Sequence, residues 1–215
     1  MATSLGTVTS YAVRRAGIVD VTHVARLLEA SAPELDIDGD GTVDGPADPL
    51  VAASVTRLAL SHVVLQHGQL WVADAGDSLH AATVWMPLGA VGLADDLRDT
   101  VVRELDAATV QAAIDPGEEV RQALAAAAPE VAAALDRVQP DVVLTALAAV
   151  PELPAAERDR LLQACIATAL EEIEGVAAAV TLVPERVAVL EAAGFTRVDE
   201  VEVGAGHLLW VGRAA

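Results

Sequence analysis

The segment VVLTALAAVPELPAAERDRLLQACIATALEEIEG, residues 142–175, carries the clearest structural pattern in the chain. Its first part, residues 142–150, is a run of Val, Leu, Thr and Ala that stops at Pro151, which is typical of a β-strand. From Pro154 to Gly175 apolar residues recur at intervals of three and four, which predicts an amphipathic helix. The following residues, 176–183, predict a second strand. The centre of the chain is therefore expected to form a strand–helix–strand unit.

Further strands and helices are expected on both sides of this unit. Apolar periodicity and turn residues predict strands at 10–16, 69–75, 79–87, 196–203 and 207–211, and helices at 50–67, 93–137 and 184–193. Another helix begins at Asp20, which is expected to cap it. The helical insertion at 93–137 is expected to break near residues 115–117. We find no repeats or linkers, so the sequence predicts one α/β (α+β) domain over residues 1–215, with an acidic Asp/Gly-rich loop at 33–49.

The composition limits the classes of partner. The chain has 13 basic residues, all of them Arg, and 32 acidic ones, which gives a formal net charge of −19. Such a charge repels the phosphate backbone of nucleic acids, so no nucleic-acid partner is expected. The single Cys165 indicates a reducing compartment, and we predict a cytoplasmic protein. Charged residues interrupt the apolar stretches before the ~20 residues that a membrane span needs, so no membrane partner is expected.

Three segments of the chain resemble the GNAT superfamily of acetyl-CoA-dependent N-acetyltransferases. LWVADA (70–75) followed by AATVWMP (81–87) resembles the paired central strands of that family, and 144–163 resembles its strand–loop–helix that holds the cofactor. EAAGF (191–195) is similar to the family's junction before the last two strands. The resemblance implies a mixed central β-sheet flanked by helices, acetyl-CoA as cofactor and a small amine as acceptor. Family members open a gap between the fourth and fifth strands to admit the pantetheine arm, and this feature can be checked in the structure.

The loop before the cofactor helix departs from the family pattern. Family members place a glycine-rich turn here, so that backbone N–H groups can approach the pyrophosphate of CoA at a helix N-terminus. An ungapped alignment puts Ala155, Glu157 and Asp159 where the family has glycine. Two carboxylates at these positions predict a degenerate acetyl-CoA site. The cofactor-binding residues that the resemblance implies are Ala149, Ala155, Ala156, Arg158 and Arg160, with the two arginines as an alternative grip on phosphate.

The proton donor of the family is also missing. Many members carry a tyrosine in the helix before the GF junction to protonate the departing thiolate, and Leu190 stands at that position. Val183 stands where an asparagine often opens the same helix. The one tyrosine, Tyr11, is expected to lie far from the site, and Cys165 is expected in the core. No catalytic residue can be assigned from the sequence.

The segment DIDGDGTVD, residues 36–44, matches the first nine positions of an EF-hand calcium loop. We refer to it as the Asp loop. Carboxylates at alternate positions can converge on one cation, and the residue types predict a metal site formed by Asp36, Asp38, Asp40, Thr42 and Asp44. The twelfth position holds Ala47 where the pattern requires glutamate, so weak calcium binding, in the ~10⁻⁴–10⁻³ M range, is expected. The alternative is a surface loop whose Asp side chains bond their own backbone. In either case the loop is expected to line the rim of an acceptor cleft and attract a cationic amine.

These observations support three functional hypotheses. The first is a GNAT-fold domain without acetyl transfer that binds a small molecule or a protein. The second is an active acyl-CoA-dependent N-acyltransferase that grips CoA through Arg158 and Arg160. The third is a binding module modulated by calcium. The oligomeric state cannot be predicted from the sequence.

Overall fold

A computed structural model describes residues 10–46, 48–76, 78–88 and 117–215. Seven strands form one sheet in the order β1-β2-β3-β4-β5-β7-β6. All neighbours are antiparallel except β4 and β5, which are parallel. The strands are β1 (Ala12–Arg15), β2 (Gln69–Ala75), β3 (Ser78–Pro87), β4 (Val142–Ala149), β5 (Ala177–Thr181), β6 (Phe195–Glu202) and β7 (Leu208–Ala214). The predicted mixed sheet is confirmed, and its strands come from both the beginning and the end of the chain.

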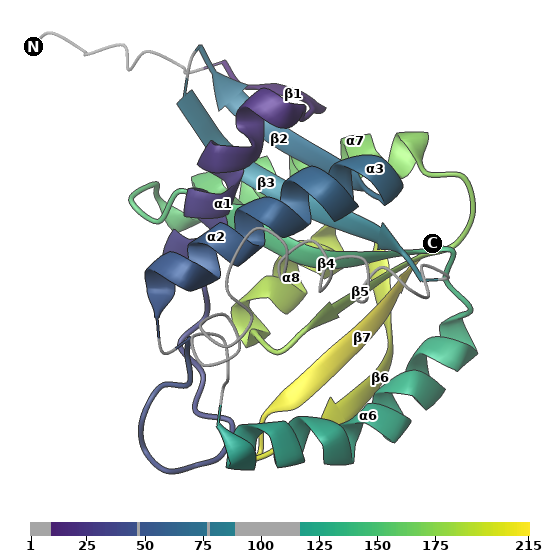
Figure 1. Ribbon diagram of the computed structural model, residues 1–215. Coiled ribbons are helices and arrows are strands. Elements are labelled where there is room, and N and C mark those ends of the chain that lie inside the picture. The colour runs from purple at the N-terminus through teal and green to yellow at the C-terminus, as the bar shows by residue number, and fades with distance from the viewer. Residues whose placement is uncertain (1–9, 47, 77, 89–116) are drawn as a thin grey trace, which may run out of the picture.

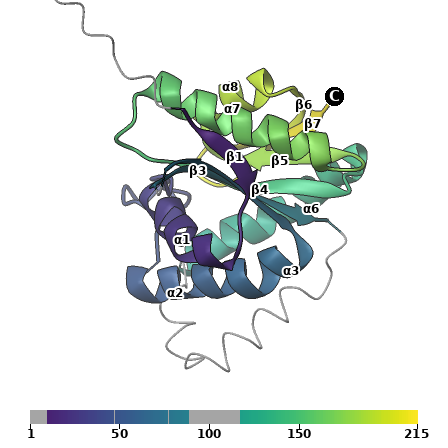
Figure 2. The ribbon, with the colours of Figure 1, turned by 90° about the horizontal axis from the view of Figure 1, so that it is seen from above.

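Helices cover both faces of the sheet, as Figure 2 shows. One face carries α7 and α8, and the other carries α1, α2, α3 and α6. Their bounds are α1 (Val21–Ala30), α2 (Pro49–Ala59), α3 (Leu65–His67), α6 (Glu118–Val138), α7 (Ala155–Glu172) and α8 (Pro184–Ala192). The short segment η1 (Ile18–Asp20) leads into α1. A second short segment, η2 (Leu60–Val64), continues α2 into α3. The three layers follow from the apolar stripe on each helix, which must be buried against the sheet.

Three groups of buried side chains fill the space between the layers. The first lies under α7 and α8 and includes Trp85 and Leu190. The second lies under α1 and η2, around Val24 and Val72. The third lies under α6, around Val211. Figure 1 shows α6 running beside β6 and β7, apart from α1, α2 and α3. The helical insertion that the sequence predicts at 93–137 is observed from Glu118 onward, and its first part lies outside the described residues.

The predicted helix at 50–67 differs in detail from the observed one. Asp48 caps it with its carboxylate, which accepts hydrogen bonds from the Leu50 and Val51 amides, and Pro49 occupies the first turn. Its middle, η2, is a π-helical segment, a local irregularity that bends an α-helix. The span Pro49–His67 is long and apolar enough to cross a membrane by length and composition, and 17% of that span is buried in the domain. The expected absence of a membrane partner and the cytoplasmic location stay predictions.

The prediction that Asp20 caps the helix after it is wrong, because its side chain bonds other groups. Asp20 precedes α1, but its side chain makes no capping bond to that helix. Its carboxylate instead accepts two hydrogen bonds from the Arg14 guanidinium, at 2.8 and 2.9 Å, and one from the Gly17 amide at 2.8 Å. The Arg14 hydrogen bond is the main cause that lowers the pKa of Asp20. The pair therefore fastens β1 to the start of α1.

Candidate functional site

The parallel strands β4 and β5 separate toward their carboxyl ends. Only Val142–Leu144 pair with Ala177–Ala179, although β4 continues to Ala149 and β5 to Thr181. A bulge marks the point of separation. Val84 of β3 pairs with Ala146, and Trp85 pairs with Leu144, which leaves Thr145 as an extra residue in β4. Such a bulge bends a strand, so β4 turns away from β5. The gap that the resemblance implies between these two strands is thus present.

A cavity of about 230 Å³ lies at the carboxyl ends of the separated strands. Residues from the end of α1, the end of β4, the first half of α7 and the start of α8 enclose it. Its walls are formed by Ala30, Ser31, Ala32, Leu147, Ala148, Ala149, Pro151, Arg158, Asp159, Leu162, Val183, Glu185, Arg186 and Val189. Two of the predicted cofactor-binding residues, Ala149 and Arg158, belong to this wall. The other three, Ala155, Ala156 and Arg160, are exposed residues of α7 that do not line it.

The loop between β4 and α7 is built around two prolines. Pro151 and Pro154 have no N–H group, so this loop has fewer amide donors for a ligand than a glycine-rich loop has. The amides of Glu157 and Arg158 donate to the carbonyl oxygen of Pro154 at 2.9 and 3.0 Å. Arg158 also donates from Nη1 to the Pro151 carbonyl oxygen at 2.9 Å, which ties its side chain across the loop. An anion in the cavity would therefore meet side chains more than backbone.

Glu157 points away from the cavity because Tyr11 holds it. The Tyr11 hydroxyl donates to Oε1 of Glu157 at 2.5 Å, and Glu157 does not line the cavity. The expectation that Tyr11 lies far from the site is wrong, since it contacts the first turn of the cofactor helix from 146 residues away. Of the two carboxylates that the sequence places at glycine positions, only Asp159 faces the cavity.

His80 of β3 packs against Tyr11, the residue that holds Glu157. Ala81 of β3 pairs with Ala73, and Leu79 pairs with Asp74, so His80 is the extra residue of a second bulge. Its ring packs edge-on against Tyr11, with ring centroids 5.1 Å apart. Its Nδ1 atom is buried without a hydrogen-bond partner in the described part of the chain. The group therefore lies beside the α7 N-terminus and outside the cavity.

Arg186 is a cavity residue that the sequence reasoning missed. Its Nη2 donates to the carbonyl oxygen of Ser31 at 2.8 Å, and the Ser31 hydroxyl donates to the carbonyl oxygen of Ala149 at 2.8 Å. Burial lowers the pKa of Arg186. The sequence did contain a signal for Arg186. A basic residue in the first turn of a helix opposes the helix dipole, so its presence there indicates a specific role. These contacts join the ends of α1, β4 and α8 around the cavity.

Within the described part of the chain, no ion pair neutralises either cavity arginine. Among residues 10–46, 48–76, 78–88 and 117–215, no carboxylate oxygen lies within 4.0 Å of the side-chain nitrogens of Arg158 or Arg186. The backbone carbonyls that they bond carry only partial charge. The cavity thus presents two guanidinium groups whose positive charge is available to an anion.

The position of the family's proton donor is closed to solvent and to ligands. Leu190 is fully buried in the core under α8, and Val183 lines the cavity with an apolar side chain. Cys165 is also fully buried, as expected, and burial raises the pKa of its thiol to about 12. The titratable groups on the cavity wall are the two arginines, Asp159 and Glu185. The lining that the structure describes thus contains no thiol, imidazole or phenol.

The Asp loop lies away from this cavity. None of its residues lines the cavity, and the expected position of the aspartates at the rim of an acceptor cleft stays a prediction. His207 in the β6–β7 turn instead bonds the Asp36 carbonyl oxygen through Nε2 at 2.8 Å. A Cβ atom on Gly204 of the same turn would lie 2.3 Å from the Ile37 carbonyl oxygen. The loop is therefore docked tightly on the β6–β7 turn.

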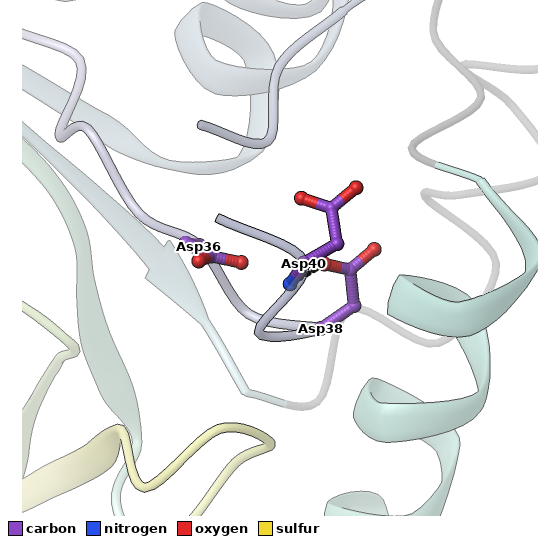
Figure 3. A group of neighbouring side chains, drawn as sticks. All are labelled: Asp36, Asp38 and Asp40. Carbon is purple, nitrogen blue, oxygen red and sulfur yellow. Dashed lines mark hydrogen bonds between the residues drawn. The ribbon is translucent and has the colours of Figure 1, made fainter. Parts of the chain in front are cut away.

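The carboxylates of the Asp loop partly converge. Ligand atoms of Asp36, Asp38 and Asp40 lie within 4.8 Å of one another, and Figure 3 shows these three side chains at the bend of the loop. Asp44 is not in this group, and its carboxylate accepts a hydrogen bond from the Ile37 amide at 2.5 Å.

The same carboxylates also bond the backbone of their own loop. Asp36 accepts from the amides of Gly39 and Gly41, at 2.8 and 2.9 Å, and Asp40 accepts from the Thr42 amide and hydroxyl, at 2.7 and 2.6 Å. The Thr42 hydroxyl bond, followed by its amide bond, lowers the pKa of Asp40. The amide of Asp40 acts to lower the pKa of Asp38, but desolvation and the three neighbouring carboxylates outweigh it and the pKa is raised. Hydrogen bonds of this kind shape an acidic turn without any cation.

Comparison with known proteins identifies the fold. No protein-family model matches the sequence, and no curated protein matches it. A mosquito arylalkylamine N-acetyltransferase-like protein shares the fold with a TM-score of 0.57 and 13% identity, over 95% of this chain and 99% of its own. A Drosophila melanogaster polyamine N-acetyltransferase that forms N-acetylagmatine gives 0.54 and 11% over 95% and 99%. The C-terminal condensation domain of Ebony, in complex with β-alanyl-dopamine, gives 0.65 and 7% over 95% and 98%. The chain therefore has a GNAT-like fold, as the sequence predicts.

Proposed function

We propose that this chain binds a small anionic ligand, with acyl-CoA as the first candidate, in the cavity between β4 and β5, and that it does not transfer acetyl groups efficiently. The observation that carries the proposal is the pair of guanidinium groups, Arg158 and Arg186, on the wall of a cavity at the separated ends of the two parallel strands. GNAT-like proteins admit their cofactor at this gap, and here the gap carries positive charge that can bind phosphate.

The electrostatics of Arg186 support an anionic ligand. Burial disfavours its charged form, the charge of Glu185 offsets this loss of solvation only in part, and no described carboxylate forms an ion pair with Arg186. A phosphate oxygen would compensate through a charge-assisted hydrogen bond, which is worth about 1.5–3 kcal/mol. The net charge of −19 opposes an anion at long range, but salt screens that repulsion beyond ~8 Å, so local contacts decide the affinity.

The absence of transfer is supported by the side chains around the cavity. An acetyl transfer releases a thiolate, and protonation by a positioned group is worth about 10²–10⁴ in rate. Leu190 has no proton to give, and the Cys165 thiol is in the core. Asp159 and Glu185 are the carboxyl groups of the wall, and both are exposed. We therefore expect a binding domain that keeps the shape of an acetyltransferase.

The alternative is an active N-acyltransferase that acts on a small amine. It is favoured by the amine-acetylating proteins among those with this fold, and by the retained gap between β4 and β5. In this case water would have to protonate the thiolate, and the acceptor would be a small amine.

Isothermal titration calorimetry with acetyl-CoA tests the proposal. We expect micromolar binding that weakens at least tenfold in each of Arg158→Ala and Arg186→Ala, since each removes one charge-assisted contact. Arg160→Ala is the matched control, because Arg160 belongs to the same helix but does not line the cavity. Arg186→Ala removes both the positive charge and the hydrogen bond to Ser31, and the loss of that bond can disturb the fold. Arg186→Lys keeps the charge, so it separates the effect of the charge on binding from the effect of the shape of the side chain. Lack of binding by the wild-type chain would overturn the proposal.

Mass spectrometry of acetyl-CoA mixed with small amines then decides between binding and transfer. The binding domain leaves the amines unmodified at enzyme concentrations that bind acetyl-CoA. Acetylated amine that accumulates with multiple turnovers, and that is lost in Arg186→Ala, would establish the alternative.

A further inference from the structure

A second hollow lies on the opposite face of the sheet from α7 and α8. It measures about 400 Å³ and runs between α6 and the ends of β5, β6 and β7. The residues of its wall that the structure describes are all Ala, Val or Leu: Leu124, Ala127, Ala128, Val131, Ala132, Leu135, Leu182, Val203 and Leu209. We call it the α6 groove. Although the chain has 32 acidic residues, this described wall contains no carboxylate.

The α6 groove and the cavity meet at the carboxyl end of β5. Leu182 lines the groove and the next residue, Val183, lines the cavity. Consecutive residues of extended chain point to opposite faces of a sheet, which places the two hollows back to back across this point. Here β5 is no longer paired with β4, whose last bonded residue is Leu144. The two hollows therefore adjoin at a point where the β4–β5 ladder has already ended.

We propose that the α6 groove holds the hydrocarbon chain of an acyl-CoA whose phosphates bind Arg158 and Arg186. This inference rests on the proposed function, and it specifies the substrate class as medium-chain acyl-CoA rather than acetyl-CoA. A hydrocarbon chain fits the wall because it brings no hydrogen-bonding group. The backbone of a bound peptide would lose its hydrogen bonds to water there without gaining others, which is costly.

The size of the groove supports a chain of several methylenes. Its volume lies at the lower end of the ~300–1,000 Å³ found for small-molecule sites. Each methylene that is fully buried strengthens binding by up to about fourfold, as 0.8 kcal/mol per methylene converts. Octanoyl-CoA has six methylenes more than acetyl-CoA, so burial of only two of them strengthens binding by more than about tenfold.

Calorimetry with acetyl-, butyryl- and octanoyl-CoA tests this inference. We expect the affinity to rise with chain length in the wild type, by at least tenfold from acetyl to octanoyl. Ala128→Trp places a large side chain into the groove from an exposed position of α6, and it is expected to remove this rise while acetyl-CoA still binds. Ala126→Trp is the control, since Ala126 is an exposed residue of the same helix that does not line the groove.

The possible outcomes separate this inference from the proposed function. Equal affinities for the three ligands would overturn the inference, leave the groove to a protein partner or a second copy of the chain, and leave the acyl-CoA proposal standing. A rise that persists in Ala128→Trp would also overturn it, because the chain would then lie elsewhere. Absence of binding by all three ligands would overturn the proposed function and the inference with it.

Discussion

The two carboxylates at the start of α7 should affect anion binding unequally. Asp159 lines the cavity, whereas Glu157 is held by the Tyr11 hydroxyl at 2.5 Å outside it. We therefore predict that Asp159→Asn strengthens binding of acetyl-CoA and that Glu157→Gln leaves it nearly unchanged. From the sequence alone, both side chains appear to oppose the ligand equally, so this pair of variants tests what the structure adds.

The size of the effect follows from the dimensions of the cavity. A carboxylate on the wall of a 230 Å³ cavity lies roughly 6 Å from an anion at its centre. Two unit charges at that separation interact by about 0.7 kcal/mol in water and by about 3 kcal/mol at an effective dielectric constant of 20. Because Asp159 is exposed, we take a value near the lower limit, about 1 kcal/mol. Asp159→Asn should then strengthen binding about fivefold.

Calorimetry at two ionic strengths measures this effect. The gain in Asp159→Asn should be largest at about 20 mM salt and should shrink at 0.3 M, since the interaction is between partly exposed charges. Equal gains in Asp159→Asn and Glu157→Gln would refute the reasoning, because they would mean that Glu157 reaches the ligand despite Tyr11. A weaker affinity in Asp159→Asn would also refute it and would indicate that the Asp159 carboxylate supports binding of acetyl-CoA instead of opposing it.

Three further predictions concern stability. Arg14 lowers the pKa of Asp20, so the stabilisation by this half-exposed pair is present above the pKa of the unfolded chain and is lost as pH falls through the lower folded value. Asp20→Asn should lower the melting temperature by a few degrees at pH 7, and calorimetric scans should show this loss shrinking as pH falls below the ordinary pKa of an aspartate. Gly204→Ala should lower the melting temperature more than Gly206→Ala, since both residues have positive φ but only a Cβ on Gly204 would meet Ile37, at 2.3 Å; equal losses would contradict the tight docking of the Asp loop. The calcium prediction has a thermal test: a site of ~10⁻³ M affinity raises the melting temperature by about 2–4 °C at 5 mM calcium, and no rise beyond that in a potassium chloride control of equal ionic strength would reject it.

The sequence predicted most of the fold because its strong signals are local. The strand predicted at 69–75 has the same bounds as β2. The π-helical segment η2 was not predicted. A π-helical turn holds one residue more than an α-helical turn, and a run of apolar residues does not distinguish the two. The parts of the fold that depend on periodicity and on turn residues are thus accessible from sequence.

The site could be predicted only in outline. Ala149 and Arg158 were found because they lie beside a motif with a known position, whereas Arg186 lies 28 residues beyond Arg158 and joins the wall through the packing of α8. The contact between Tyr11 and Glu157 spans 146 residues and depends on the order of the strands, which puts β1 at the edge of the sheet and lets Tyr11, just before it, pack against the buried group under α7. Without an alignment to show paired changes, such contacts leave no trace in a single sequence.

The two prolines of the β4–α7 loop also determine where ligand selectivity can reside. A proline ring fixes φ near −65°, and Pro154 has φ −54° and ψ 141° in the loop. A loop of this kind loses little conformational entropy on folding, but its main chain cannot remould itself around a guest. Adaptation to differently shaped anions is left to the side chains of Arg158 and Arg186, each of which bonds one backbone carbonyl and has further N–H donors. We therefore expect a tolerant recognition, in which related phosphorylated or carboxylated compounds are accepted with graded affinities instead of one compound being strictly selected.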